Sequence, residues 1–535
     1  MDISKREKKQ SNVFLSGVLI LSLSTVIVKI IGLIYKIPML RLLGSEGMGY
    51  FNSAYEIYTL FCTVATTGLP VAMSVIISSM NDPDREANGV LRAAMRLFLC
   101  LGAVGGGIML VFSRPFAAFL GNESAAYCIL AISPTVLLIC ISSAYRGYFQ
   151  GRGRMTPTAL SQAIEALGKL ILGLILAAVA LEAGKSTEKV AAFAVLGLVL
   201  GTAASTFYLF VAKGRGKAEP LVTVDRKSEG EMRKKLLRVA IPVTLSSVVI
   251  SVTKVIDMST ILRRLQALGA SSEAAFAAYG NYTTLALPLF SLAPALISSV
   301  ALPLIPSLSR AASSGDVKEQ SRVLGDALRL TALVSMPISL GLTLFSEPIL
   351  NLIFAGEGEA IAYTAPLLSL LGPSVVLSCL ITVGNAALQA YGRSGVPVIS
   401  TVIGSLAKII IAYLLIGDPR VGILGAPIST FICDLLINVV NIFCLCRVLP
   451  EFPSVDKILL RPFLSAAISV SLARLGYNAL VVRFGESAIL TVSAITLAAV
   501  VYAITAVMLR AVDRDDILSL PFVRKGRIEN EKKEI

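Results

Sequence analysis

Residues 13–36 read VFLSGVLILSLSTVIVKIIGLIYK, an apolar run with a lysine past its middle and another at its end. About 20 apolar residues in a helix are enough to cross the hydrocarbon core of a membrane. Runs of this length recur along most of the 535 residues, of which 55% are hydrophobic and 15% charged. The sequence therefore predicts an all-α polytopic membrane protein.

Apolar runs separated by polar breaks predict about fourteen transmembrane helices. An even number of spans puts both termini on one side of the membrane, and basic residues at both ends and between residues 212 and 235 make that side cytoplasmic. The net charge of +14 fits this orientation and contact with anionic membrane lipids, so we expect no nucleic-acid partner. The spans lie near 13–36, 50–78, 90–112, 125–148, 157–181, 190–211, 236–260, 275–306, 326–349, 361–390, 397–416, 423–446, 460–481 and 487–510.

Enzyme chemistry is an improbable task for this composition. The chain has no histidine, the commonest general base, and its eight cysteines lack the spacing of a metal site. The spans also leave no room for a soluble catalytic domain. We therefore expect no enzyme, no metal and no cofactor, although transport coupled to Na⁺ or H⁺ stays open.

An internal repeat relates the two halves of the chain. AYEIYT at 54–59 matches AYGNYT at 278–283, Lys29 falls on Lys254, and Lys169 falls on Lys408. Each half holds an even number of spans, so the copies keep one orientation and predict two pseudo-symmetric six-helix lobes around a central cavity. The predicted parts are a basic cytoplasmic N-terminus (1–12), an N-lobe of spans 1–6 (13–211), a basic cytoplasmic linker (212–235), a C-lobe of spans 7–12 (236–446), two C-terminal spans (460–510) and a cytoplasmic tail (511–535).

Polar stripes on the predicted spans indicate where this cavity lies. Ser and Thr on such stripes commonly serve helix packing, and Lys254 alternatively neutralises Asp257 one turn away. Packing needs no buried ammonium, however, so Lys29 and Lys254 favour a cavity for an anionic substrate, and two ammonium groups suit a diphosphate. The predicted cavity residues are Lys29, Lys36, Arg41, Asn52, Glu56, Lys254 and Asp257.

Two further polar groups have more than one interpretation. Gln162, Glu165 and Lys169 form a secondary polar face on span 5, which the second half reduces to Lys408. Asp434 and Asn438 lie one turn apart on span 12 and form either a cation site, to which Asp257 is a further candidate ligand, or an interhelical hydrogen-bond seam.

Three segments carry a family resemblance: residues 14–61 (FLSGVLILSLSTVIVKIIGLIYKIPMLRLLGSEGMGYFNSAYEIYTLF), TTGLPVAMSVIIS after them, and GYFQGRGRMTPTALSQAIEALGK from Gly147. They resemble the stage V sporulation protein B group and the MurJ-like lipid II flippases of the multidrug/oligosaccharidyl-lipid/polysaccharide exporter superfamily. Those flippases carry a basic cavity residue in the first span, and Lys29 occupies the equivalent position in this chain. Arg41 matches another basic position near the end of that span. Tyr35 replaces a second cavity arginine and Glu56 adds an acid, which leaves a different headgroup or coupling ion open.

The resemblance implies a MATE-like, two-lobed, monomeric flippase in the cytoplasmic membrane of a bacterium. Its substrate would be an undecaprenyl-diphosphate-linked sugar, lipid II or a related polysaccharide intermediate, moved outward by alternating access for peptidoglycan, other cell-wall polysaccharide or spore-cortex synthesis. The alternative is a cation-coupled multidrug exporter of the same superfamily, against which the two lysines argue. A polytopic glycosyltransferase would need carboxylates in large external loops, and the predicted external loops are short.

Overall fold

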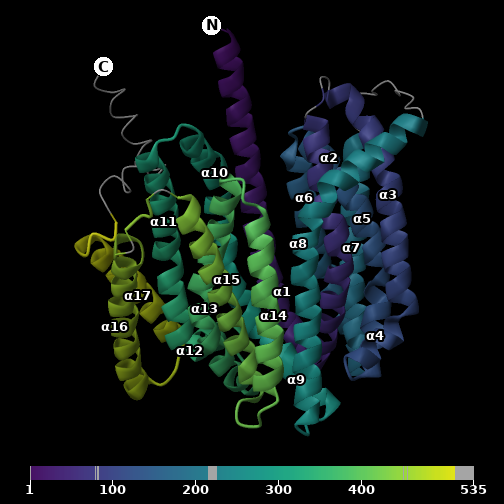
Figure 1. The fold of residues 1–535 in the computed structure, drawn as a ribbon. Helices are drawn as coiled ribbons and strands as arrows, with labels where there is room; N and C mark the ends of the chain where they lie inside the picture. The colour runs from purple at the N-terminus through teal and green to yellow at the C-terminus, as the bar shows by residue number, and fades with distance from the viewer. Residues whose placement is uncertain are drawn as a thin grey trace, which may run out of the picture. The chain divides into compact units, whose positions relative to one another are not determined.

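A computed structural model describes residues 2–78, 80, 83–214, 226–449, 451–454 and 456–512, and every regular element in these ranges is helical (Figure 1). Up to residue 286 the elements are α1 (Asp2–Thr66), α2 (Gly68–Ser78), α3 (Pro83–Val111), α4 (Ser113–Phe119), η1 (Glu123–Ala125), α5 (Ala126–Gly151), α6 (Met155–Glu182), α7 (Thr187–Gly214), α8 (Arg226–Ala267), α9 (Ser272–Asn281) and the π-helical turn η2 (Tyr282–Ala286).

The remaining elements follow from residue 287. They are α10 (Leu287–Ser313), α11 (Val317–Leu344), α12 (Ser346–Ile353), α13 (Gly358–Ala390), α14 (Gly395–Ile416), η3 (Gly422–Leu424), α15 (Gly425–Val448), η4 (Asp456–Leu460), α16 (Arg461–Phe484) and α17 (Ala488–Met508). Part of the predicted linker, residues 215–225, and the tail from residue 513 lie outside the described residues.

Helix α1 is interrupted at Gly44, where the backbone turns to a φ of 66° and a ψ of 176°. A positive φ strains residues that carry a Cβ atom and is open to glycine. The interruption separates the first predicted span from the second, so α1 consists of two helical legs that meet at Gly44.

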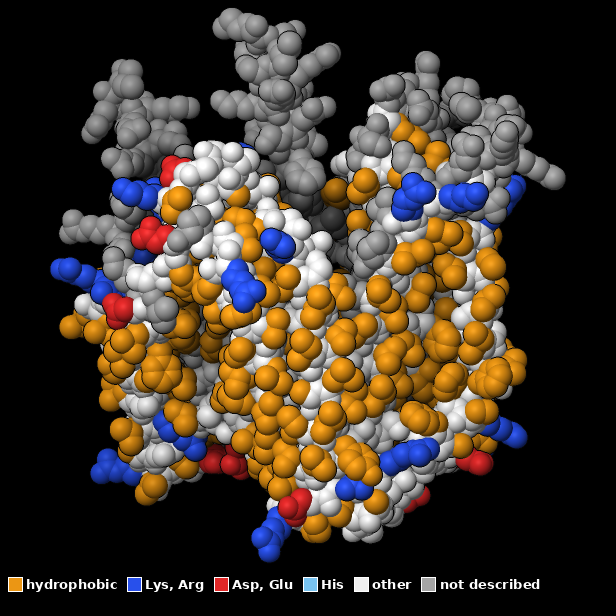
Figure 2. Space-filling view, in the orientation of Figure 1, with side chains coloured by type: hydrophobic (Ala, Val, Ile, Leu, Met, Phe, Trp, Pro, Cys, Tyr) orange, Lys and Arg blue, Asp and Glu red, His pale blue; other side chains and the backbone are white. Residues whose placement is uncertain are grey.

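Twelve segments among the described residues are long and apolar enough to cross a membrane, which confirms an all-helical polytopic membrane protein. The first, Ile27–Ile77, has 51 residues and runs from the later part of the first predicted span, past Gly44, through nearly all of the second. Helix α8 covers the seventh predicted span but is not among these twelve segments. On the face drawn in Figure 2, hydrophobic side chains cover the middle of the helices and charged side chains lie toward their ends.

The chain forms two compact units. The first comprises Met1–Ala295 and Thr401–Cys433, and the second comprises Leu296–Ser400 and Asp434–Ile535. These units follow packing and do not coincide with the repeat halves, so the lobe boundaries at 13–211 and 236–446 stay a prediction.

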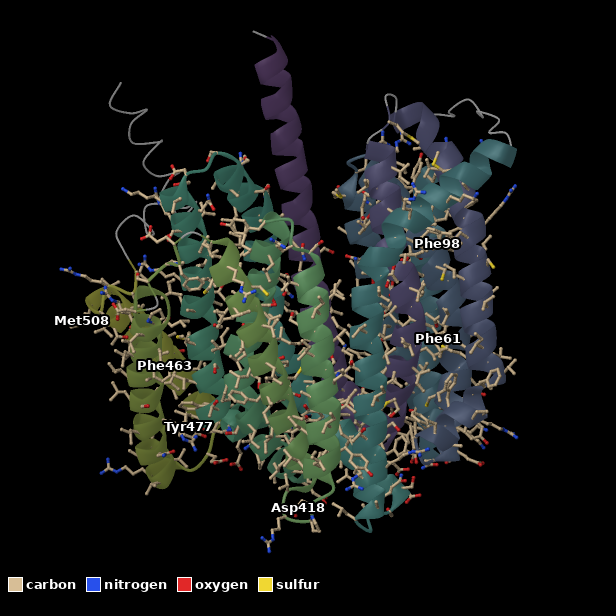
Figure 3. The ribbon with its side chains drawn as sticks, in the orientation of Figure 1. Phe61, Phe98, Asp418, Phe463, Tyr477 and Met508 are labelled. Atoms are coloured by element: carbon tan, nitrogen blue, oxygen red, sulfur yellow. The ribbon has the colours of Figure 1, made fainter. Side chains whose placement is uncertain are left out.

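Each unit has its own buried apolar core. In the first unit, Phe98 of α3 and Tyr148 of α5 pack together with residues of α2, α7 and α8. In the second unit, Phe345 packs against Tyr477 of α16 with ring centroids 5.7 Å apart. Figure 3 labels Phe61 and Phe98 in the first unit, and it labels Phe463 and Tyr477 at successive levels of α16.

Candidate functional site

A cavity of about 380 Å³ lies inside the first unit, among α1, α5, α6 and α7. It is placed within segments that are long and apolar enough to cross a membrane, yet much of its lining is polar. Ionisable groups at this depth are costly unless they meet water, a partner or a substrate. The polar and aromatic lining consists of Lys29, Tyr35, Tyr55, Arg146, Gln162, Glu165 and Lys169.

Close packing of α6 on α7 fixes one wall of the cavity. A Cβ atom on Gly168 would stand 2.5 Å from the Cα of Gly201, and one on Gly197 would stand 2.2 Å from the Cα of Gly173. Only glycine allows two helix backbones to approach this closely. The α6 backbone is therefore held against α7, while Gln162, Glu165 and Lys169, at helical spacing, present their side chains to the cavity.

Glu165 forms an ion pair with Arg146 of α5, with 2.8 Å between Arg146 Nη2 and Glu165 Oε2. Their side chains are 12% and 20% exposed, so the pair is largely shielded from solvent. Arg146 Nε also donates to the Ser161 hydroxyl at 3.0 Å, and Nη2 donates to the Ser205 hydroxyl at 3.3 Å. The hydrogen bonds that Arg146 donates to hydroxyl groups of α6 and α7 thus hold the guanidinium in one orientation.

Lys169 lies among aromatic rings. Its ammonium is 4.5 Å from the ring centroid of Tyr55, 5.1 Å from that of Tyr35 and 5.3 Å from that of Phe51. The negative face of an aromatic ring attracts a cation without neutralising its charge. Among the described residues Lys169 forms no ion pair, although Glu165 precedes it by one helical turn.

Lys29 lies at the α1 wall of the cavity. Its ammonium donates to the backbone carbonyl of Ser291 at 3.4 Å, and Lys254 of α8 is near enough to repel it electrostatically. The Lys254 side chain is exposed. The two lysines that the repeat relates are therefore brought together, as like charges.

Lys36 and Asn52 do not line this cavity. The Lys36 ammonium donates to the Thr283 carbonyl at 2.6 Å, and the Asn52 amide donates to the hydroxyls of Thr283 and Thr284 at 2.9 and 2.8 Å. Both acceptors belong to η2, so these two side chains join α1 to the π-helical turn. Glu56 is half-buried and attracts Lys36, and Arg41 is exposed on α1.

The α1–α9 contact beside this turn is made by backbone atoms. A Cβ atom on Gly49 would lie 2.1 Å from the carbonyl oxygen of Phe276, and one on Gly280 would lie 2.1 Å from that of Ser45. No other residue fits at either position without separating the helices.

Asp257 forms its ion pair with Lys408 of α14, not with Lys254. Lys408 Nζ and Asp257 Oδ2 are 2.8 Å apart, and the two side chains are 16% and 12% exposed. The sequence made Asp257 a candidate ligand for a coupling cation, and in the structure the Lys408 ammonium lies beside its carboxylate. Lys408 and Lys169 are equivalent in the repeat, but only Lys408 has a carboxylate partner.

Asp434 and Asn438 contact α13 within the second unit. Ser378 donates to Asp434, and the Asn438 amide donates to the Leu377 carbonyl at 3.0 Å. One turn further, Asn441 donates to the Asn385 side chain at 2.8 Å. These are the contacts of an interhelical seam.

Arg146 is the charged lining residue that the sequence interpretation missed. It lies near the end of a predicted span, in a stretch with Arg152 and Arg154, where basic residues commonly set membrane orientation. The signal that distinguishes it is the acid Glu165 at a similar depth on the next span, because two opposite charges inside apolar segments usually pair.

Comparison with known proteins places these features in a family. Residues 14–312 match the family model described as polysaccharide biosynthesis protein, which is more than half of the chain. The chain belongs to this polysaccharide biosynthesis protein family. Residues 242–414 also match the MatE family model. The family consists of transporters, which confirms the expectation that the chain is no enzyme.

Two relatives in Bacillus subtilis match three quarters or more of the chain. Stage V sporulation protein B of Bacillus subtilis (strain 168) is 26% identical over 534 residues, 96% of this chain and 98% of that protein. The lipid II flippase MurJ of the same organism is 27% identical over 421 residues, 75% of this chain and 77% of that protein. The resemblance found in the sequence is thereby confirmed.

Solved structures show the same fold. The lipid II flippase MurJ in an inward closed conformation superposes with a TM-score of 0.70 at 19% identity, covering 92% of this chain and 99% of that chain. An inward-facing MATE family multidrug resistance transporter of the MOP superfamily superposes with a TM-score of 0.64 at 16% identity, covering 82% of this chain and 97% of that chain. Both solved transporters thus share the fold found here.

Proposed function

We propose that the protein is a flippase that moves an undecaprenyl-diphosphate-linked sugar outward across the bacterial cytoplasmic membrane by alternating access. The substrate is lipid II or a related polysaccharide intermediate for peptidoglycan, another wall polysaccharide or the spore cortex. The family match and the two Bacillus subtilis relatives support this class of substrate.

The proposal includes the membrane topology. The two legs of α1 around Gly44 cross separately and α8 adds another crossing, so the twelve apolar segments become fourteen spans. Twelve of these spans form two pseudo-symmetric six-helix lobes, and α16 and α17 are the two additional spans. Both termini lie in the cytoplasm, and the protein acts as a monomer among membrane lipids.

The observation that carries the proposal is the charge of the cavity. Lys29 and Lys169 both line it, and among the described residues neither has a carboxylate partner. Lys254 adds a further positive charge near Lys29. Uncompensated ammonium groups in a region of low dielectric are unfavourable alone and bind an anion strongly. A diphosphate offers charge and acceptor oxygens to both lysines.

The prenyl chain of such a lipid needs no polar cavity, because it stays in the hydrocarbon of the membrane. Only the diphosphate and the sugars must cross through the protein. A cavity of about 380 Å³ with cationic and hydrogen-bonding walls suits a headgroup of this kind.

Complementation tests the proposal in cells. Lys29→Met and Lys169→Met remove one positive charge each while keeping a long unbranched side chain. We expect both variants to insert in the membrane but to lose rescue of a flippase-depleted strain. Lys185→Met, in the exposed turn after α6, is the matched control and should rescue fully. Full rescue by both cavity variants would refute the assignment.

A cation-coupled multidrug exporter is the second candidate, because the MatE family model matches residues 242–414 and MATE transporters share the fold. Cationic drugs favour acidic and aromatic sites, and this cavity has two tyrosines and Glu165. The uncompensated ammonium groups of Lys29 and Lys169 would nevertheless repel a cation. Dye efflux that depends on Lys169 would favour the exporter over the flippase.

A further inference from the structure

Glu165 is out of place in a cavity that binds an anion. It is the single acidic residue among the described lining residues, and it would repel a diphosphate. If its role were to neutralise the cavity lysines, Lys169 at the next helical turn would be its natural partner. Glu165 instead pairs with Arg146, and Lys169 contacts aromatic rings.

The Arg146 pair holds Glu165 in a fixed orientation. Arg146 is anchored by the hydroxyls of Ser161 and Ser205, so its guanidinium cannot follow a departing carboxylate without losing these bonds. It donates to Oε2 of Glu165, and among the described residues no donor is bonded to Oε1. The cavity thus contains a preorganised acceptor oxygen, with its charge partly offset by the arginine.

The lipid-linked headgroup differs in hydrogen-bonding character along its length. Phosphate oxygens only accept hydrogen bonds, whereas sugar hydroxyl and acetamido groups also donate them. A carboxylate oxygen therefore accepts from a sugar and repels a phosphate. Gln162, one turn before Glu165, adds both an amide donor and an amide acceptor on the same face of α6.

The order of residues along α6 matches this polarity. Lys169 is at one end of the polar face, Glu165 is one turn away, and Gln162 is about 10 Å along the axis from Lys169. A diphosphate joined to its first sugar has a comparable length, with the anion at one end and the hydroxyl groups at the other.

We propose that Glu165 and Gln162 form a sugar-hydroxyl subsite that determines which headgroup the cavity accepts, with Arg146 as the residue that positions Glu165. This inference rests on the proposed function and extends it from the diphosphate to the saccharide. The second half of the chain lacks this carboxylate, because Gly404 stands at the position equivalent to Glu165 when Lys169 is aligned with Lys408.

Two lipids separate the subsite from the anion site: lipid II, and undecaprenyl diphosphate, which carries no sugar. Binding of each is measured on the full-length protein in nanodiscs. We expect Glu165→Gln to weaken lipid II binding at least ~10-fold, the effect of losing a hydrogen bond to a charged group. Binding of undecaprenyl diphosphate should stay unchanged or tighten, because the variant also removes a charge that repels phosphate. Lys169→Met should weaken both lipids by a similar factor.

Glu165→Gln also disturbs Arg146, so Gln162→Leu provides a second variant that leaves the ion pair intact. It should change the ratio of the two dissociation constants in the same direction. Size-exclusion profiles and thermal midpoints establish that the variants are folded.

The outcomes separate this inference from the proposed function. Wild-type binding of both lipids, with an unchanged ratio in both Glu165→Gln and Gln162→Leu, would overturn the subsite and leave the flippase intact. If the wild-type protein binds neither lipid, the proposed function and the subsite are overturned together.

Discussion

The ion pair between Asp257 and Lys408 gives a prediction whose size follows from the structure. Replacing Lys408 by Met leaves the Asp257 carboxylate without its partner, in a site where both side chains are less than one-fifth exposed. Removing one member of a buried pair costs about 3–5 kcal/mol, because the remaining charge stays desolvated. Removing both members is close to neutral when apolar or amide groups of similar volume replace them.

The assay is a double-mutant cycle on thermal stability in detergent with Asp257→Asn, Lys408→Met and the double variant. We expect each single variant to be strongly destabilised and the double variant to regain most of the loss, a coupling of about 3 kcal/mol or more. The matched control is Arg322 with Asp326, an exposed pair at 3.9 Å, for which we expect less than about 0.5 kcal/mol. Equal coupling in the two cycles would refute a buried pair at Asp257.

Two further predictions concern helix contacts. Gly49→Ala should destabilise the protein by about 1–3 kcal/mol because its Cβ atom would meet the Phe276 carbonyl at 2.1 Å, whereas Gly107→Ala, with open space around its Cβ, should be neutral or slightly stabilising in the same thermal assay. Asn441→Leu should lower stability by about 1 kcal/mol by removing the hydrogen bond to Asn385, and an unchanged midpoint would show that this bond contributes nothing.

Much of the fold was predictable because membrane spans depend on local composition. Apolar runs located the helices, and the break at Gly44 falls between two predicted spans. The face shared by Gln162, Glu165 and Lys169 was predictable as well, since helical periodicity alone places these residues together, and they do line one cavity.

The partners of charged residues were not predictable, because they depend on which helices touch. Nearness along the helix suggested Lys254 as the partner of Asp257, but packing brings Lys408 of α14 to it. Lys36 followed the same stripe as Lys29, yet η2 exposes a backbone carbonyl that Lys36 binds. A π-helical turn leaves no clear periodic signal in the sequence.

The central claim is that this chain translocates a lipid-linked diphosphate sugar through a lysine-lined cavity. The most direct measurement is reconstitution of the purified protein in liposomes with labelled lipid II in the inner leaflet, and in parallel with a non-peptidoglycan lipid-linked sugar, with and without an ion gradient. The account predicts that at least one of the two substrates reaches the outer leaflet at a rate that Lys29→Met and Lys169→Met abolish and Lys185→Met preserves. Translocation of neither substrate, or translocation that both cavity variants retain in full, would contradict it.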